Sequence, residues 1–249
     1  MIMENNVIPL SQKDIFTFSC SREVPCFNEC CRDLNQFLTP YDILRLKNRL
    51  GLSSGLFLER YASQKTGPET GLPIITLKTD DSRSLKCPFV TASGCSVYED
   101  RPSSCRTYPL MRLASRSRDT GETTERFILL QESHCLGFNQ GRTWTVNEWI
   151  ESQKVSFYNE MNDMLLELIA LKNRRPGSLD IKSRFYFHMA LYDIDTFRTH
   201  IFEKNILDQW NSENSDAVPW DIIENDDIAL LKLGHQWIKK ILFDNTQQD

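Results

Sequence analysis

The distribution of cysteine is the feature that most constrains what this chain of 249 residues can fold into. Four cysteines fall in the run CSREVPCFNECC, three in CPFVTASGCSVYEDRPSSC, and one follows alone. The remainder of the chain contains none. The eight residues are Cys20, Cys26, Cys30, Cys31, Cys87, Cys95, Cys105 and Cys135. Eight unrelated core cysteines would be scattered over the whole sequence, so this clustering favours a common role.

Metal ligation is the role that suits clustered thiols best. Thiolates are soft ligands that bind zinc or iron tetrahedrally, and loops with proline and glycine allow several sulfurs to converge on one point. Eight thiols could fill two four-coordinate sites. The neighbours Cys30 and Cys31 point opposite ways in an extended segment, so they could serve different sites, or one could bind while the other packs. We expect all eight cysteines to converge in space around zinc or an iron–sulfur cluster.

Other uses of these cysteines are less consistent with the sequence. Four disulfides require an oxidising compartment. The start MIMENNVIPL lacks the basic and apolar parts of an export signal, so a cytoplasmic location is expected. Packing of free thiols as small apolar groups would not explain their clustering. His134, next to Cys135, could add an imidazole ligand or could point outward.

Composition excludes several other classes of protein. Apolar residues make up 40% of the chain and charged residues 25%, which is typical of a globular protein. The net charge of −5 gives no basic domain for a nucleic-acid partner. No apolar run approaches the ~20 residues that cross a bilayer, so no membrane association is expected.

The region that contains the cysteines has the marks of a small mixed domain. Thr39, Pro40, Asp42 and Gly51 predict a helix with a capped start and a glycine stop, and Ser53 is expected to cap a second short helix through SSGLFLERYASQ. The segments PIITLK, MRLA and RFILLQ predict strands of one antiparallel sheet. The polar tract SRSRDTGETTE is expected to connect the last two. We assign residues 14–140 to a cysteine-cluster metal-binding domain.

The rest of the chain is predicted to be helical. Thr145 and Glu148 have the spacing of a capping box, and apolar residues then recur at helical steps until Pro176 and Gly177. That pattern predicts one long helix. Further helices are expected to begin at Ser178, at Asp193 through IDTFRTHIFEKNIL, and at Asp226, with NSENSDAVP as a polar loop. The predicted fold is therefore α+β, with an α-helical domain over residues 145–249.

The cysteine region also resembles a known family. The run FSCSREVPCFNECC, a later Cys-Pro-Phe, the signature GCSVYEDRPSSCRTYP and a late cysteine are similar to the YkgJ-type cysteine-cluster family of bacteria, described as a zinc- or iron-chelating domain. The resemblance covers about residues 16 to 138. It implies that all eight cysteines occupy cluster positions. The first group of cysteines departs from the family. The family usually has two, two and no residues between successive cysteines, whereas this chain has five, three and none.

The resemblance also implies that several residues around Cys105 belong to the family's motif. These are Arg101, Pro102, Arg106, Tyr108 and Pro109. A four-thiolate zinc site carries a net charge of about −2, which a nearby guanidinium could offset while donating to sulfur. Arg101 and Arg106 are therefore candidate cofactor-binding residues. The alternative is that they pair with Glu99 or Asp100 at the surface.

Three functions are open at this point. The first is binding of zinc or an iron–sulfur cluster, such as a 4Fe-4S centre, with no reaction named. The second, implied by resemblance over the same domain, is an iron–sulfur-dependent enzyme related to flagellin lysine N-methylase. The radical spacing C-x3-C-x2-C has Asp33 in place of its third cysteine, so radical chemistry is not expected. The third is a zinc-stabilised adaptor whose helices bind a protein partner.

Overall fold

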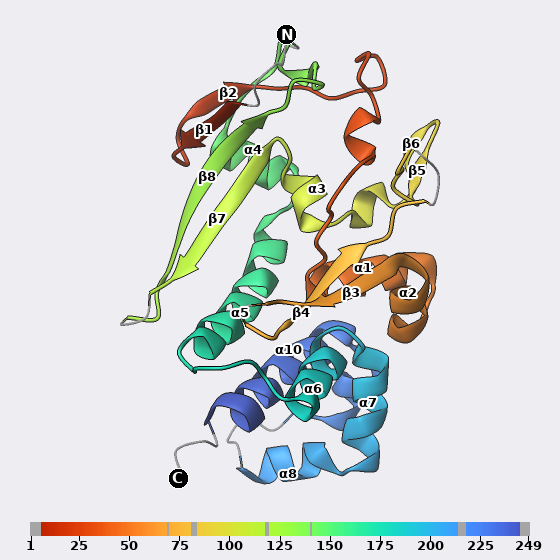
Figure 1. Cartoon of the computed structure of the whole chain (residues 1–249), viewed down its shortest axis with the longest axis vertical. Coiled ribbons are helices and arrows are strands. Elements are labelled where there is room, and N and C mark those ends of the chain that lie inside the picture. The colour runs from red at the N-terminus through yellow and green to blue at the C-terminus, as the bar shows by residue number, and fades with distance from the viewer. Residues whose placement is uncertain are drawn as a thin grey trace. The chain divides into compact units, whose positions relative to one another are not determined.

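The computed structural model describes residues 6–68, 70–80, 84–117, 120–139, 141–213 and 218–244 (Figure 1). It confirms the predicted α+β class. Two compact units divide the chain: unit 1 comprises Met1–Phe37 and Leu77–Asp163, and unit 2 comprises Leu38–Thr76 and Met164–Asp249. The two units do not coincide with the predicted domains 14–140 and 145–249, because residues 38–76 cluster with the C-terminal helices. The domain division itself stays a prediction.

Unit 1 is built on a three-stranded antiparallel sheet with the order β1-β8-β7. Its strands are β1 (Asn6–Leu10), β7 (Leu110–Arg116) and β8 (Thr123–Gln131). Leu110 lies opposite Leu129, and Leu10 lies opposite Phe127. Opposite residues project from the same face, so these side chains form one apolar surface. The core on that face adds buried residues from the flanking segments, namely Phe16, Phe18, Val146 and Trp149.

Two of the three predicted strands belong to this sheet, and the third does not. MRLA and RFILLQ fall in β7 and β8, as predicted. PIITLK forms β4 (Pro73–Leu77), which pairs with β3 (Ala62–Thr66) in a separate two-stranded sheet. The chain turns back locally, with the Gly67 N–H donating to the Leu72 carbonyl at 2.8 Å and Gly71 at a φ of 70°. The nearest partner of β4 is therefore its neighbour in sequence.

A second small sheet in unit 1 joins the start of the described chain to residues near 144. Strand β2 (Ile15–Thr17) pairs antiparallel with β9 (Thr143–Thr145). Helix α4 (Val146–Ser152) follows, and Thr145 and Glu148 form the predicted capping box.

The predicted long helix after Thr145 is wrong, because it is broken into α4 and α5 (Ser156–Asn173). Lys154 has a φ of 53°, the left-handed backbone that ends a helix. Arg106 donates to the Gln153 carbonyl at 2.6 Å, and Arg101 donates to the Gln153 side chain at 2.6 Å. Contacts from distant residues therefore fix the turn, and the local apolar pattern does not show them.

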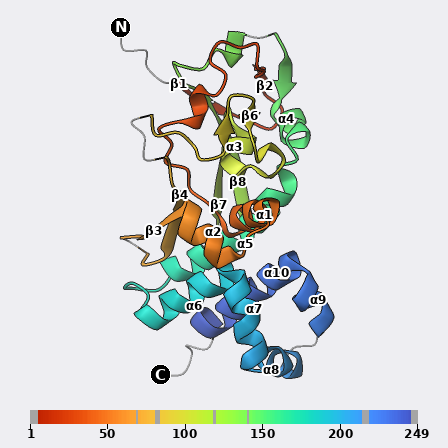
Figure 2. The same ribbon diagram turned by 90° about the vertical axis from the view of Figure 1, so that its right-hand side faces the viewer.

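Unit 2 is mostly helical. Its further elements are α1 (Pro40–Leu50), α2 (Ser54–Tyr61), α6 (Ile181–Leu191), α7 (Ile194–Glu203), α8 (Ile206–Glu213), α9 (Trp220–Asn225), α10 (Asp227–Ile238) and the π-helix η4 (Lys239–Asp244). Helices α6, α7 and α10 lie side by side (Figures 1 and 2). A Cβ on Gly234 would lie 2.3 Å from the Ala190 carbonyl oxygen, so α10 approaches α6 too closely for any larger residue.

Most helix starts in unit 2 follow the sequence signals. Thr39 and Asp42 form a capping box, and Ser53 and Asp226 accept from backbone N–H groups of α2 and α10, as predicted. Asp180, and not Ser178, caps α6.

The helix predicted through IDTFRTHIFEKNIL is divided into α7 and α8. Asn205 has a φ of 49° between them, which interrupts the helical backbone. The predicted loop NSENSDAVP lies partly outside the described residues.

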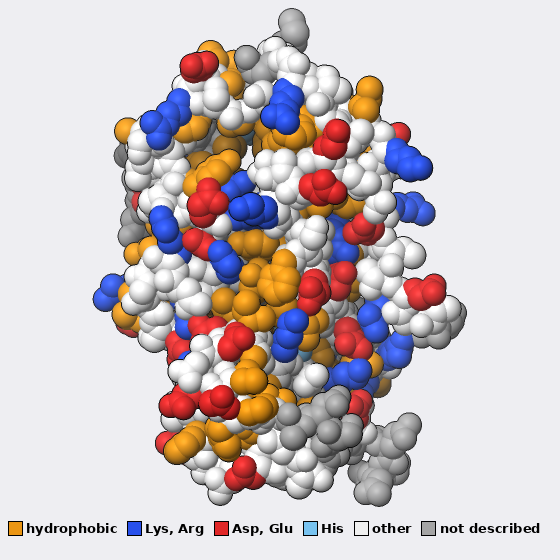
Figure 3. All heavy atoms as spheres, turned by 180° about the vertical axis from the view of Figure 1, so that it is seen from behind, with side chains coloured by type: hydrophobic (Ala, Val, Ile, Leu, Met, Phe, Trp, Pro, Cys, Tyr) orange, Lys and Arg blue, Asp and Glu red, His pale blue; other side chains and the backbone are white. Residues whose placement is uncertain are grey.

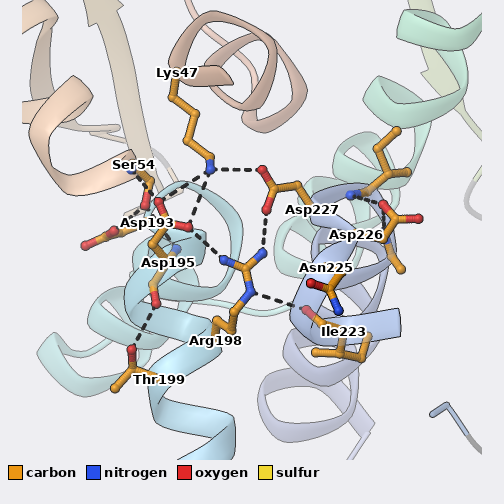
Figure 4. Close-up of polar contacts among 12 residues, drawn as sticks. Lys47, Ser54, Asp193, Asp195, Arg198, Thr199, Ile223, Asn225, Asp226 and Asp227 are labelled. Carbon is orange, nitrogen blue, oxygen red and sulfur yellow. Dashed lines mark hydrogen bonds and ion pairs between the residues drawn. The ribbon is translucent and has the colours of Figure 1, made fainter. Parts of the chain in front are cut away.

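A partly buried ion-pair network joins α1, α7 and α10 within unit 2 (Figure 4). The ammonium of Lys47, a residue only 5% exposed, lies 2.9 Å from a carboxylate oxygen of Asp227 and 3.4 Å from Asp195. The guanidinium of Arg198 pairs with the same two carboxylates. Asp195 also accepts the Ser54 N–H at 2.7 Å. Two cations and two anions thus neutralise one another at the junction of three helices.

The surface carries charges of both signs. Lysine and arginine side chains are interspersed with aspartate and glutamate on the face drawn in Figure 3. Among the described helices, none combines the length and the apolar character that a membrane crossing requires.

Candidate metal centre

The first cysteine run folds into consecutive tight turns. The backbone N–H groups of Val24, Phe27 and Glu29 donate to the carbonyl oxygens of Ser21, Val24 and Cys26, respectively, each at 2.9 to 3.1 Å. The 3₁₀ helix η1 (Glu29–Cys31) closes the run, after Asn28 at a φ of 71°. A coiled segment of this kind allows its thiols to project in several directions, which a helix or strand would prevent.

The second cysteine run is hydrogen-bonded to the first. The Cys87 N–H donates to the Cys31 carbonyl at 2.8 Å, and Arg32 and Lys86 form an isolated bridge. The small hairpin of β5 (Val90–Thr91) and β6 (Gly94–Cys95) follows, and the Asn28 side chain donates to the Thr91 carbonyl at 3.0 Å. These bonds bring residues more than fifty positions apart into one layer of loops.

Cys105 and Cys135 approach the same loops from other elements. Cys105 lies on α3 (Ser103–Thr107), and its thiol donates to the side-chain oxygen of Gln36 at 3.3 Å. The N–H of Leu136, next to Cys135, donates to the sulfur of Cys26 at 3.1 Å. Sequence reasoning missed Gln36, because no motif marks it, although only 8% of its surface is exposed.

The thiols perturb one another. Burial is the first cause that raises the pKa of Cys20, to about 11, with the nearby Cys30, Cys26 and Cys135 adding to it. A hydrogen bond from the Cys31 thiol lowers the pKa of Cys30 to about 7. The same hydrogen bond is the largest cause that raises the pKa of Cys31, and burial and the charges of Cys30, Cys87 and Cys105 raise it further.

The remaining thiols fit into the same pattern. Burial is the largest cause that raises the pKa values of Cys87, Cys95 and Cys135, and neighbouring thiols raise them further. Cys87 responds to Cys95 and Cys30, and Cys135 responds to Cys26 and Cys30. All eight thiols therefore lie in electrostatic contact with at least one other, and Cys30 reaches both halves of the set.

The donor set fits a thiophilic metal. None of the eight cysteines forms a disulfide. Several neighbouring thiolates repel one another, and a bound cation removes that repulsion and favours their deprotonation. Among the described side chains, no three cysteine, histidine or acidic groups already surround a common point as ligands. The thiols are therefore neighbours without being arranged around one point, and which of them bind metal stays a prediction.

Arg101 and Arg106 are buried, with exposed fractions of 8% and 4%. They donate to the backbone carbonyls of Tyr98 and Glu99, in addition to Gln153. The guanidinium groups face backbone oxygens inside the unit, and Arg101 also responds to the charge of Glu99, so the role of the two arginines stays a prediction. Arg101 also acts electrostatically on Cys95. Burial raises the pKa of the Cys95 thiol, and the positive charge of Arg101 opposes that rise. One buried positive charge thus lies near the cysteines.

Two other residues flank the late cysteine. The Tyr108 side chain packs with Cys135 against the core of unit 1, and the Tyr108 ring lies 5.9 Å from that of Phe18. His134 has 43% of its side chain exposed, with Nε2 at 3.8 Å from Glu132.

Comparison with known proteins identifies the cysteine region. Residues 19–136 match a family model named CxxCxxCC and described as "Putative zinc- or iron-chelating domain". This segment contains all eight cysteines, so the resemblance noted from the sequence is confirmed. No curated protein and no solved structure matches the chain.

Proposed function

We propose that this chain, which carries a zinc- or iron-chelating domain over residues 19–136, holds two thiolate-ligated metal centres joined through the Cys30–Cys31 peptide. The first centre uses the thiols that surround Cys20: Cys20, Cys26, Cys30 and Cys135. The second uses Cys31, the two thiols Cys87 and Cys105 that act on it, and Cys95, which acts on Cys87. The observation that supports this division is the set of mutual electrostatic influences: Cys20 responds to Cys26 and Cys135, Cys31 responds to Cys87 and Cys105, and Cys30 acts on thiols of both groups.

Cys30 and Cys31 lie at the boundary of the two proposed centres. Both residues lie in the 3₁₀ helix η1, and their thiols are hydrogen-bonded to each other. Eight thiolates exceed the four that one tetrahedral ion takes, so we assign this pair to two adjacent ions, one thiol to each.

The surroundings of each centre suit a negative metal–thiolate group. Four thiolates and one divalent ion carry a charge of about −2. The Leu136 N–H donates to Cys26 in the first centre, and Arg101 lies near Cys95 and Cys105 in the second. Donors of this kind orient sulfur ligands and spread their charge. Arg101 is then a supporting group near the ligands of the second centre, and Arg106 contacts the backbone of Glu99 and Gln153.

The main role we assign to the metal is to hold the cysteine loops together. The loops have few buried apolar side chains of their own, chiefly Val24, Phe89 and Val97. A site that forms only in the folded chain adds its binding energy to folding. Zinc supplies this stabilisation alone, and an iron–sulfur cluster would add electron transfer.

Replacing the two adjacent cysteines separately tests the division. We expect Cys30→Ser and Cys31→Ser each to lose about half of the bound metal, because each removes one ligand from a different centre. Metal is counted per chain by mass spectrometry on protein purified without oxygen, with the visible spectrum showing any iron–sulfur cluster.

Two further variants make the grouping falsifiable. Cys20→Ser should reproduce the Cys30→Ser spectrum and protease pattern, and Cys95→Ser should reproduce those of Cys31→Ser. Ser21→Ala, on the same exposed loop, is the control and should bind metal as the wild type does. Full metal content in both Cys30→Ser and Cys31→Ser, or identical patterns in all four cysteine variants, would contradict two centres.

A further inference from the structure

The amide of Gln36 is hydrogen-bonded at Cys105, although 69 positions separate the two residues. The Cys105 thiol donates to Oε1 of Gln36 at 3.3 Å. Nε2 of the same amide donates to the Phe37 carbonyl at 2.8 Å and to the hydroxyl of Ser104, the residue before Cys105. Both ends of the Gln36 amide are therefore bonded, and one partner is a cysteine of the second proposed centre.

Gln36 reaches Cys105 from a buried position. Only 8% of Gln36 is exposed, and its backbone carbonyl accepts the Leu77 N–H at 2.8 Å. Ser104 and Cys105 lie on an exposed part of the short helix α3. A glutamine is seldom buried, and burying its amide costs free energy unless its polar atoms are hydrogen-bonded. The contact with α3 supplies those hydrogen bonds and fixes the exposed thiol from behind.

The amide also matches the change that a bound metal makes at the sulfur. A free thiol donates a hydrogen bond, whereas a metal-bound thiolate has no proton and only accepts. Half a turn of the terminal amide of Gln36 exchanges Oε1 and Nε2. Nε2 then donates to the Cys105 sulfur, and Oε1 accepts the hydroxyl of Ser104, which can donate as well as accept. Of the described bonds of this side chain, the one to the Phe37 carbonyl is lost.

We propose that Gln36 is a positioning residue of the second metal centre. Its amide accepts the Cys105 thiol in the metal-free chain and donates to the Cys105 thiolate once metal is bound. This inference rests on the proposed function, because it takes Cys105 to be a ligand. Every residue that it uses belongs to unit 1.

Binding of cobalt(II) to each centre separately tests this role in the full-length chain. Cys20→Ser leaves only the second centre intact, and Cys95→Ser leaves only the first. Gln36→Met, added to each, removes the amide and keeps a side chain of similar length. Loss of a group that supports a metal ligand typically weakens binding about 10- to 100-fold, and we expect this loss in the Cys20→Ser chain and no change in the Cys95→Ser chain. Affinity is measured by competition with a chelator.

The absorption spectrum separates donation to sulfur from support of the fold. A hydrogen bond to a thiolate stabilises its electrons, so loss of the Gln36 donor should move the sulfur-to-cobalt absorption of the Cys20→Ser chain to longer wavelength. Gln36→Glu keeps an acceptor without the donor, and its negative charge should weaken cobalt binding at least as much as Gln36→Met does. Gln64→Met, at an exposed position of strand β3, is the matched control and should change neither affinity nor spectrum.

Circular dichroism confirms that each variant is folded. An unchanged affinity or an unshifted absorption of Gln36→Met in the Cys20→Ser chain would overturn the role of Gln36 and leave the metal centres in place. Equal weakening in the Cys20→Ser and Cys95→Ser chains, or binding by Gln36→Glu as tight as by the parent chain, would do the same. Absence of cobalt binding to the wild type would contradict the metal centres themselves, and this inference with them.

Discussion

Chelation of the metal from the full-length chain is expected to loosen the cysteine loops while the helices of unit 2 stay folded. Structural zinc contributes about 10 to 16 kcal/mol of binding energy in small domains, far more than the few buried side chains of these loops supply. Amide hydrogen exchange should accelerate by several orders of magnitude in residues 20–36 and 84–105. The exchange rate is measured by mass spectrometry before and after chelation, with metal added back as a reversal.

Two other regions serve as internal controls. The face of the β1-β8-β7 sheet that packs on Phe16, Phe18 and Trp149 has its own apolar core and should keep more of its protection. Helices α6 and α10 should exchange at unchanged rates, because their buried residues belong to unit 2. Unchanged protection of both cysteine loops after complete metal removal would show that the thiols are simply packed.

The second large effect is expected from Lys47→Met. The substitution removes a buried ammonium and leaves the carboxylates of Asp195 and Asp227 with Arg198 as their shared cation. Breaking a fully buried pair by removing one partner costs about 3 to 5 kcal/mol. Because Asp195 and Asp227 are partly exposed and keep Arg198 as a cation, we expect the free energy of unfolding to fall by about 3 kcal/mol at most, measured by urea denaturation of the full-length chain while helical circular dichroism is followed.

Its control is Lys65→Met, at an exposed position of strand β3, which should change stability by less than about 0.5 kcal/mol.

The dependence of the free energy of unfolding on acid pH is a second measurement on the same network. Burial raises the pKa of Asp227, but hydrogen bonds from Lys47 and Arg198 outweigh it and hold the pKa below its usual value. Asp227 therefore stabilises the wild type above the unfolded pKa of about 3.9, and this stability is lost as the pH falls through the lower folded pKa. Equal stability of Lys47→Met and Lys65→Met would contradict this account of the network.

Local signals predicted the elements whose causes are local. The capping boxes of Thr39 with Asp42 and of Thr145 with Glu148 are both present, because a cap involves residues three apart. The break at Lys154 could not be predicted in this way. It depends on Arg101 and Arg106, which contact Gln153 from about fifty positions away.

The candidate site shows the same division. Clustering in sequence indicated that the cysteines share a function, and the family match covers all of them. The approach of Leu136 to Cys26, and of Gln36 to Cys105, follows from hydrogen bonds between distant loops, which spacing does not encode. From the sequence, Arg101 and Arg106 could offset the charge of a metal–thiolate site or pair with Glu99 or Asp100 at the surface, and neither alternative indicated that both side chains are buried.

The most direct test of the central claim is a joint count of metal and free thiol in the full-length wild type, purified without oxygen. Metal is counted by mass spectrometry, and reactive thiols are counted with a thiol reagent on the native and on the unfolded protein. Two centres of four thiolates each predict two zinc ions, or the iron and sulfide of two clusters, with all eight thiols protected in the native state and released on unfolding. A chain that binds no stoichiometric metal and reacts at its exposed thiols Cys20, Cys30 and Cys105 in the native state would contradict the account.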